Sequence, residues 1–319
     1  MSLIKKAVEL QVVNTMNMMI FGMPGMGKTT LALSMPRPLL LDFDNGVKRV
    51  NPLHKQEAGI VEVNDWNEIH ELVNEDLSDY DTVVVDTAGK MINFIITYKC
   101  GQRQPQIRDW QGINAEFNWF VSMLNRLNKN VVFVAHADSR KENDNDYYFP
   151  LLRDKNYKEL LTDFDLLGFA EMKSIAGVIT RTITFDPTNR NDGKNTCQLP
   201  SVINIPEILD RNGASIRDND FLTKNVLIPF QNMKAHELGL QKEYSELLDT
   251  IKKDIALIKD ADSANKFVAG IKTNYNHIGS SVTTARVLLQ TRVAELGLTW
   301  DKTKKLYVDK TKKAKKVDE

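Results

Sequence analysis

The segment Gly22-Met-Pro-Gly-Met-Gly-Lys28-Thr29 limits the fold of this chain more than any other, because it has the spacing of a phosphate-binding P-loop. In this pattern glycines turn backbone N–H groups toward a phosphate, the lysine reaches the β- and γ-oxygens, and the hydroxyl residue ligates Mg²⁺. An apolar run, 16–21, precedes the segment and a helical pattern follows it, as the motif requires. We therefore expect ATP and Mg²⁺ here. The expected contacts are Gly22, Met23, Pro24, Gly25, Met26, Gly27, Lys28, Thr29 and Thr30.

Short, continuously apolar runs in the first half of the chain predict buried strands. Continuous rather than alternating hydrophobicity is typical of a parallel sheet that is covered on both faces. Helical patterns separate the runs, so we expect a doubly wound α/β sheet with right-handed crossovers. The expected strands are 16–21, 38–41, 82–85 and 131–135, and the expected helices are 29–34, 66–77 and 113–127.

The second half predicts a loop, a hairpin and then helices. The polar run 138–148 is typical of a mobile loop, and a helix is expected at 157–169. Alternation over 177–185, a turn, and a second strand at 196–199 predict a β-hairpin at the sheet edge. Helices are expected at 236–258, 261–275 and 281–296. We therefore expect an ATPase domain over 1–230, a helical region over 231–300, and a lysine-rich, disordered tail over 301–319.

Polar residues follow three of the predicted strands, at the sheet edge where ligands of open α/β sheets bind. Asp86 ends the run Thr-Val-Val-Val-Asp and suits the Mg²⁺ site together with Thr29. Asp44, in Leu-Leu-Leu-Asp-Phe-Asp-Asn-Gly, is a candidate to orient the attacking water, with a capped turn as the alternative. His136 ends Val-Val-Phe-Val-Ala and is a candidate sensor of the γ-phosphate, with a structural histidine as the alternative.

These residues together resemble the RecA-like ATPase core, and most of all phage-encoded ATPases of that superfamily that are associated with single-strand annealing and recombination. The resemblance covers roughly residues 14–205 and rests on the P-loop and the three strand ends. It implies a mostly parallel central sheet flanked by helices, an edge hairpin and a helical C-terminal extension. In RecA-like proteins a glutamate stands at the place of Asp44, which is one methylene shorter. The resemblance therefore implies slow turnover that a partner stimulates.

The resemblance also implies a basic residue on the edge hairpin that faces the ATP of a neighbouring subunit. Lys194 is the candidate, with Arg190 and Arg181 behind it, and solvated hairpin charges are the alternative. Lys28, Asp44, Asp86, His136 and Lys194 thus form the expected catalytic set, with ATP bound between subunits of an oligomer.

Two loops carry basic residues beside aromatic ones, a combination that suits single-stranded DNA. The first contains Lys99, Arg103, Arg108 and Trp110; the second contains Arg140, Lys141, Tyr147, Tyr148 and Phe149. Acidic neighbours favour ordinary surface loops as the alternative. The lysines of 302–316 are a candidate electrostatic tether for nucleic acid, or else keep a helical tail soluble.

Composition leaves these expectations open. The chain has 42 basic and 42 acidic side chains, so an anionic partner needs a local patch, and two cysteines without ligand spacing indicate a reducing compartment, the host cytoplasm for a phage protein. No apolar run is long enough for a membrane span. We expect an ATPase that acts on single-stranded DNA in phage recombination or replication, alongside proteins of those processes. A small-molecule kinase and a non-hydrolysing assembly switch are the alternatives.

Overall fold

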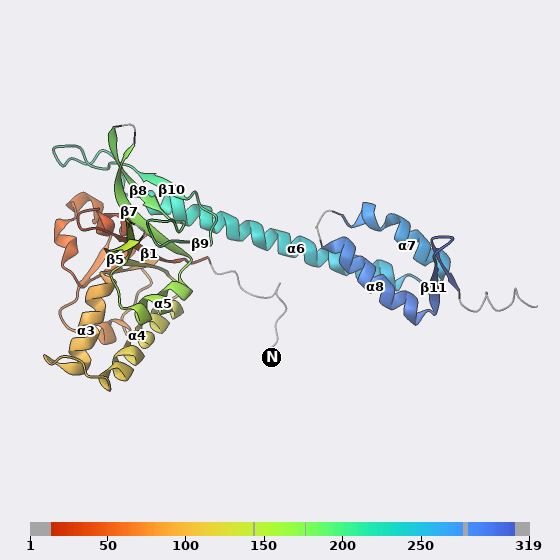
Figure 1. The fold of residues 1–319 in the computed structure, drawn as a ribbon, viewed down its shortest axis with the longest axis horizontal. Helices are drawn as coiled ribbons and strands as arrows, with labels where there is room; N and C mark the ends of the chain where they lie inside the picture. Colours follow the sequence, from red (N-terminus) through yellow and green to blue (C-terminus); the bar gives the residue numbers. More distant parts are fainter. Residues whose placement is uncertain (1–13, 143, 176, 277–279, 310–319) are drawn as a thin grey trace, which may run out of the picture. The chain divides into compact units, whose positions relative to one another are not determined.

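The computed structural model describes residues 14–142, 144–175, 177–276 and 280–309 (Figure 1). They form two compact units that divide between Met233 and Lys234, and helix α6 (Ile228–Ala256) contributes to both. The first unit contains the P-loop and a ten-stranded sheet; the second contains helices and a two-stranded sheet. Within these residues, no helix is both long enough and apolar enough to cross a membrane.

The large sheet has the order β10-β8-β7-β1-β5-β4-β2-β3, while β6 pairs with β5 and β9 with β7. The strands from β3 to β7 in this order are parallel, and β8, β10, β6 and β9 are antiparallel additions. One strand, β5, separates the P-loop strand from the strand that ends at Asp86. This is an α/β fold with a mostly parallel central sheet, as the sequence predicts, and the P-loop follows its strand β1. The bounds are β1 Asn17–Gly22, β2 Pro38–Asp42, β3 Gly59–Glu62, β4 Thr82–Asp86, β5 Asn130–Glu142, β6 Asn145–Pro150, β7 Leu166–Ile175, β8 Val178–Thr184, β9 Lys194–Asn195 and β10 Val202–Ile205.

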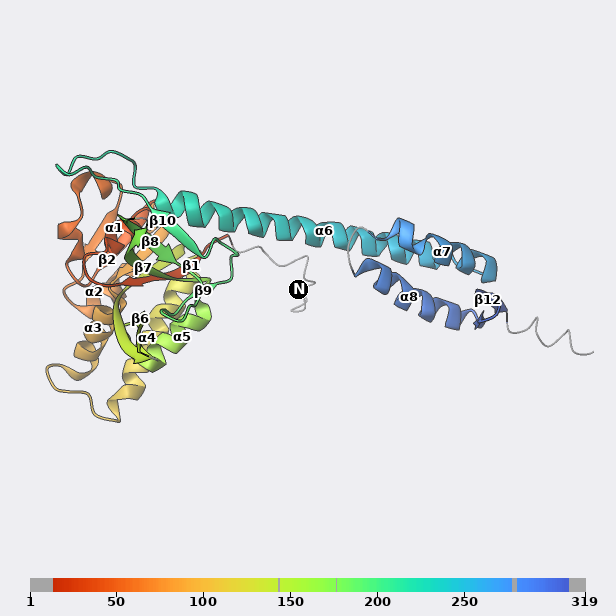
Figure 2. The same ribbon diagram turned by 45° about the horizontal axis from the view of Figure 1, so that its top comes forward.

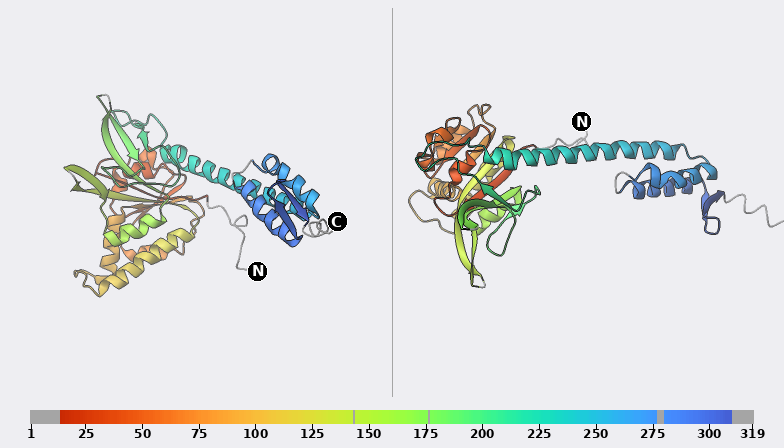
Figure 3. Two further views of the ribbon diagram at one scale, coloured as in Figure 1. Left: turned by 45° about the vertical axis from the view of Figure 1, so that its right-hand side comes forward. Right: turned by 90° about the horizontal axis from the view of Figure 1, so that it is seen from above.

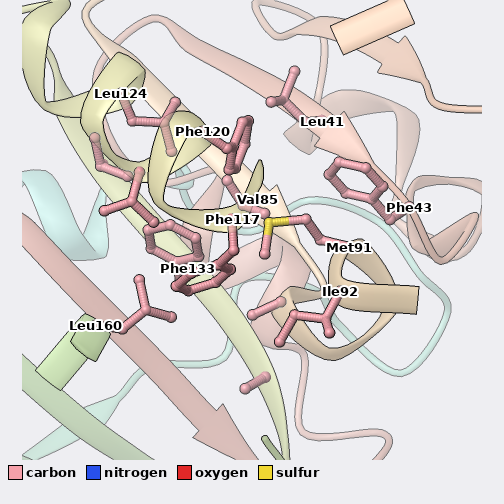
Figure 4. Packing of buried hydrophobic residues seen from close by; sticks show 14 of the residues in the cluster. Leu41, Phe43, Val85, Met91, Ile92, Phe117, Phe120, Leu124, Phe133 and Leu160 are labelled. Carbon is pink, nitrogen blue, oxygen red and sulfur yellow. The ribbon is translucent and has the colours of Figure 1, made fainter. Parts of the chain in front are cut away.

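Helices cover both faces of the sheet, which explains why its strands are apolar without alternation. Val83 and Val85 of β4 pack into one core and Val84 into the other, because successive side chains point to opposite faces. Figures 1 and 2 show α3, α4 and α5 together on one side, and Figure 4 shows the aromatic packing of that core. The helices of this unit, besides the start of α6, are α1 Lys28–Ala32, α2 Trp66–Leu72, α3 Ala88–Cys100, α4 Asp109–Arg126 and α5 Asp154–Asp163, with the 3₁₀ turns Gly46–Arg49 and Pro52–His54 and the π-helix Thr223–Leu227.

The prediction of a mobile loop over 138–148 is wrong. Strand β5 continues to Glu142, and the chain returns antiparallel to it as β6, with Ala137 opposite Pro150. This ribbon and the β7–β8 hairpin project from the sheet (Figure 3). Most side chains at the end of the ribbon are exposed, so burial imposes no apolar pattern that the sequence would reveal.

The prediction of one helix over 157–169 is also wrong. Helix α5 ends at Asp163, and β7 begins at Leu166 and lies directly beside the P-loop strand. A short apolar run such as that of Leu166 and Leu167 fits a buried helix as well as a strand, and only its partners decide. The edge hairpin therefore pairs β8 with β7, whereas 196–199 is not a strand and β10 takes its place.

The second unit has its own core, in which Ile251, Ile271 and Leu289 are buried. Helix α7 (Ala261–Asn274) begins with a capping box between Asp260 and Ser263, and α8 is Ser281–Glu295. A two-stranded sheet follows, with β11 Leu298–Asp301 and β12 Leu306–Asp309. The expectation of disorder from residue 301 is wrong for β12, which pairs in register with β11; the lysines from 310 onward lie outside the described residues.

Candidate functional site

The predicted strand ends meet at one edge of the sheet. Gly22 lies beside His136, and Asp42 beside Asp86, in the registers of β1 with β5 and of β2 with β4. A cavity of about 570 Å³ opens there between the P-loop and these strand ends. Its lining residues are Pro24, Gly25, Gly27, Lys28, Thr29, Thr30, Asp44, Gly46, Arg49, Val50, Asp86, Thr87 and His136.

The P-loop itself needs glycine where its backbone is left-handed. Gly25 has φ +82° and Gly27 has φ +71°, a region in which a side chain is strained. Gly27 precedes the first turn of α1, so the free N–H groups of that helix end open toward the cavity. The backbone thus supplies the phosphate cradle that the sequence predicts.

Lys28 is buried at the base of this cradle. Its Nζ donates to the carbonyl oxygens of Gly22 and Met23, at 2.9 Å each. Burial lowers the pKa of Lys28, and the charges of Asp86 and Asp44 oppose that shift. A desolvated ammonium held by two neutral carbonyls has strong affinity for an anion in the cavity.

Thr29 and Asp86 form the second polar pair. The Thr29 hydroxyl donates to Oδ2 of Asp86 at 2.5 Å. Burial raises the pKa of Asp86 to about 6, and the charges of Asp42 and Asp44 add to the shift, whereas the Thr29 hydrogen bond and Lys28 oppose it. A carboxylate this desolvated favours a nearby cation, and a hydroxyl beside it completes the protein part of an Mg²⁺ site. The residues therefore fit the ion that the P-loop implies.

Replacing Asp86 by Asn is expected to stabilise the nucleotide-free chain at neutral pH. The pKa of Asp86 is about 6 in the folded chain, against an ordinary value of 3.8. Between these values the folded chain binds more protons than the unfolded chain, so its stability falls as pH rises and levels off above about 6. Asp86→Asn does not undergo this loss of stability. Its free energy of unfolding therefore exceeds that of the parent chain by a difference that grows with pH to on the order of 3 kcal/mol. Urea unfolding of the variant and the parent at pH 4.5 and 7.5 measures this difference. The same difference at both pH values would contradict an energetic cost of the buried Asp86 carboxylate.

Asp42, to which the sequence interpretation gave no role of its own, builds the turn that presents Asp44. Its Oδ1 accepts from the backbone N–H groups of Asp44 at 3.3 Å and Gly46 at 2.9 Å, and its Oδ2 accepts from Val47 at 3.1 Å. A Cβ on Gly46 would approach Oδ2 of Asp86 to 3.2 Å, so a residue without a side chain lets the turn pass over that carboxylate. The two aspartates thus have separate tasks: Asp42 caps the turn, and Asp44 is the candidate catalytic carboxylate.

Asp44 lies between two basic side chains. Its Oδ2 is 3.6 Å from Nε2 of His136, and its Oδ1 is 3.9 Å from Nζ of Lys90. Burial is the largest cause that lowers the pKa of His136; Lys28 and Lys90 act in the same direction and Asp44 opposes them. The imidazole is therefore neutral at pH 7. Lys90, in the first turn of α3, carried no sequence signal, because that helix was itself not predicted.

The predicted finger, Lys194, does not lie on a hairpin. It stands in β9 opposite Leu167, in the amino-terminal half of β7, and its Nζ donates to the carbonyl oxygens of Leu161 at 2.8 Å and Thr162 at 3.3 Å. Its ammonium therefore caps the end of α5. Because β7 was not recognised as a strand, the sequence interpretation put this lysine at the wrong place in the sheet.

Arg181 of β8 instead lies against the P-loop of its own chain. Its Nη1 is 2.5 Å from the position that a Cβ on Gly27 would occupy and 3.4 Å from the Met26 carbonyl oxygen. Burial lowers the pKa of Arg181, and the charge of Glu207 opposes the shift. Arg190, the other candidate, lies 3.6 Å from Glu171.

A second cavity, of about 370 Å³, adjoins the phosphate cavity and shares Thr30 and Arg49 with it. Arg181 and Glu207 lie on its wall, together with His54, whose Nε2 is 3.0 Å from the Ser215 hydroxyl. Its polar groups include donors and acceptors, so it suits a polar heterocycle or sugar.

The first predicted DNA loop offers few unpaired cations. Lys99 binds Glu116 at 2.6 Å, and Arg103 pairs with Asp109. The ring of Trp110 is covered by the guanidinium of Arg153 at 3.6 Å. These side chains serve the protein's own packing.

In the second predicted DNA loop, which is the β5–β6 ribbon in the structure, basic and aromatic side chains also have partners within the protein. Arg140 pairs with Glu142 at 2.6 Å, and Lys141 with Asp146 at 2.9 Å. The Tyr147 hydroxyl donates to Asp192 at 2.6 Å. Tyr148 stacks on Phe169, and Arg140 also lies over the ring of Phe149. The alternative of ordinary surface segments with inward aromatics describes both places better.

Comparison with known proteins gives one family match and one curated relative. The profile of the AAA domain family matches residues 14–197. The SPbeta prophage-derived uncharacterized protein YorG of Bacillus subtilis (strain 168) is 25% identical over 159 residues, which are 44% of this chain and 45% of YorG. The chain therefore spans less than half the length of that relative.

Several solved structures are also similar at low identity. The flagellar accessory protein FlaH of Methanocaldococcus jannaschii has a TM-score of 0.36 and 10% identity, covering 63% of this chain and 93% of FlaH. The KaiC-like protein PH0186 of Pyrococcus horikoshii OT3 has a TM-score of 0.37 and 10% identity, and the match covers 60% of this chain and 89% of PH0186. The RadB recombinase has a TM-score of 0.34 and 17% identity, and the match covers 56% of this chain and 84% of the RadB chain.

Proposed function

The chain belongs to the AAA domain family, and on that premise we propose that it binds ATP with Mg²⁺ at the carboxyl edge of the sheet and hydrolyses it to ADP and phosphate. One observation carries the proposal: Lys28, the Thr29–Asp86 pair and the Asp44–His136 pair line the same cavity. Phosphoryl transfer needs a cation for the transferred group, ligands for a metal, and a group that positions the nucleophile. Each of these needs has a candidate there.

Binding would exchange internal hydrogen bonds of the empty cradle for bonds to phosphate. Lys28 would leave the carbonyl oxygens of Gly22 and Met23 and donate to the β- and γ-oxygens. The Thr29 hydroxyl would turn from Asp86 toward the metal, and the Asp86 carboxylate would hold that side of the site negative. Bound Mg²⁺ supplies the neutralisation of phosphate charge that such transfer requires.

Asp44 would hold the attacking water and accept its proton. Its carboxylate is 21% exposed, so water reaches it, and its turn is fixed by Asp42. With a neutral imidazole, His136 would donate its single N–H, placed on Nε2, either to Asp44 or to the γ-phosphate, and this exchange would sense whether the phosphate is present. Once ATP is bound, Lys28 and Thr29 would keep their contacts to phosphate and metal during the reaction, so catalysis would rest on positioning and charge.

The nucleoside would occupy the second cavity. Thr30 and Arg49 line both cavities and would lie where the phosphate chain meets the ribose. Arg181, beside the P-loop at Met26, would add positive charge to the phosphate chain within one subunit.

We further propose that the protein assembles with ATP between subunits and acts on single-stranded DNA in phage recombination or replication. Assembly is supported by exposed apolar side chains around the carboxyl edge: Met23 is 47% exposed, Leu151 52% and Met172 54%. The phage context is supported by the name of the prophage-derived relative. The action on DNA rests on the resemblance to RecA-like recombination ATPases.

Turnover of ATP with and without single-stranded DNA tests this proposal. Stimulation by DNA is the expected result. Phosphorylation of an added small acceptor would instead favour the kinase alternative, which normally needs several lid arginines, whereas the 138–156 region has just Arg140 and Arg153. Tight ATP binding without turnover would favour the assembly switch.

A further inference from the structure

The second unit contains a groove that nothing in the ATPase site explains. It has a volume of about 360 Å³ and lies between α7, α8 and the β11–β12 hairpin. Its floor is apolar, with Ile271 and Leu289 buried beneath it. Cations stand on its walls: Lys272 from α7 and Arg286 from α8. None of its lining residues is acidic.

The cations around the groove have no counter-ions among the residues that the structure describes. Lys272 and Arg286 are exposed, and neither forms an ion pair there. The turn that joins β11 to β12 adds the exposed Lys302, Lys304 and Lys305, which are also unpaired within the described part of the chain. Elsewhere in the unit, Lys252 and Arg292 pair with Asp249 and Glu295, whereas Lys253 and Lys259 form no ion pair among the described residues. The groove differs because its unpaired cations stand beside an apolar floor and an exposed tryptophan. An unpaired cluster of this kind attracts a polyanion.

An aromatic platform lies within the same groove. Trp300 is 45% exposed although it is the largest side chain of its strand. Tyr307, its partner across the hairpin, meets it edge-on with ring centroids 5.0 Å apart, which leaves the indole partly open. Asn265 of α7 fixes the backbone of Tyr307 with hydrogen bonds of 3.0 and 2.7 Å. The platform is therefore held in place before a ligand arrives.

We propose that this groove binds single-stranded nucleic acid, with a base stacked on Trp300 and phosphates on the surrounding cations. A polyanion with unstacked bases satisfies both features, because an exposed ring gains about 1 to 3 kcal/mol from each stacked base. An acidic peptide matches the charges but leaves the aromatic face without a flat partner, and a duplex keeps its bases paired. The inference rests on the proposed action on single-stranded DNA. It assigns the DNA contact to the groove of the second unit instead of the two predicted DNA loops of the first unit, where Lys99, Arg103, Arg140 and Lys141 form ion pairs within the chain.

Binding of a labelled (dT)20 oligonucleotide to the full chain tests the groove. Trp300→Ala is expected to weaken binding about 5- to 150-fold, which is the range for one lost stack. Joint replacement of Lys272, Arg286, Lys302, Lys304 and Lys305 by Gln is expected to lower the slope of log K against log salt by up to about 3.5, at about 0.7 per phosphate. Oligonucleotide binding is also expected to quench Trp300 fluorescence; Trp66, Trp110 and Trp119 all belong to the first unit.

Controls separate this site from general charge and from the ATPase. Lys252→Gln with Lys253→Gln, on α6, removes charge outside the groove and should leave affinity unchanged. ATP binding should persist in the groove variants, and Lys28→Ala should still bind the oligonucleotide. Failure of the wild-type chain to bind (dT)20, equal loss in the control pair, or equal competition by poly-L-glutamate without quenching would overturn the proposal. Loss of ATP turnover with oligonucleotide binding intact would count against the ATPase alone.

Discussion

Lys28→Ala is expected to abolish ATP binding while leaving the fold intact. The ammonium sits at the base of the phosphate cradle and has the carbonyl oxygens of Gly22 and Met23 as its hydrogen-bond acceptors. Removing it deletes charge-assisted hydrogen bonds of about 1.5 to 3 kcal/mol each, so affinity should fall roughly 100-fold or more. Titration of Mg-ATP against the purified chain measures the loss, and thermal unfolding with saturating Mg-ATP checks it, since a ligand that no longer binds no longer stabilises.

Two comparisons make that result specific. Lys158→Ala removes an exposed lysine from α5, away from the cavity, and should bind Mg-ATP like the wild-type chain. Nucleotide-free Lys28→Ala should be as stable as the parent or more so, because burial disfavours this charge and lowers the pKa of Lys28. Unchanged ATP affinity in a folded Lys28→Ala chain would remove the basis of the proposed function.

The parts of the site that could be predicted are those that lie close together in sequence. The P-loop is one segment whose spacing carries its own geometry, and Asp86 ends a run of three buried valines that can be little else than a central strand. Because parallel strands end at the same edge, Asp44, Asp86 and His136 could be placed at one site without knowing the strand order. The structure confirms that these three side chains line one cavity.

The parts that could not be predicted depend on pairing across long stretches of chain. Arg181 reaches Met26 over 155 positions through β7 and β8, and β7 was hidden in a run that fits a helix equally well. Lys194 looked like a hairpin cation because its neighbours form turns, whereas its register with Leu167 places it in the sheet. Likewise, only the fold shows that Lys272, Arg286 and Trp300 line one groove of the second unit.

Asp44→Asn is expected to lower kcat about 10²- to 10⁴-fold, the usual contribution of a general base, with a much smaller change in KM. Asn keeps the size of the side chain and the turn held by Asp42, yet it cannot accept a proton. Single-turnover hydrolysis at saturating Mg-ATP measures the effect. Asp79→Asn, at an exposed position outside the cavity, should hydrolyse ATP at the wild-type rate.

The length of the side chain at position 44 provides the sharper test. Asp44 has room to advance, because its carboxylate is 3.6 Å from His136 and 3.9 Å from Lys90, beyond hydrogen-bond length. If short reach limits turnover, Asp44→Glu should raise kcat about tenfold for each 1.4 kcal/mol of barrier removed. If kcat of Asp44→Glu were as low as that of Asp44→Asn, the site would require the shorter aspartate side chain for the position of its carboxylate. Full activity in Asp44→Asn would mean that another group, with His136 first among the candidates, positions the water.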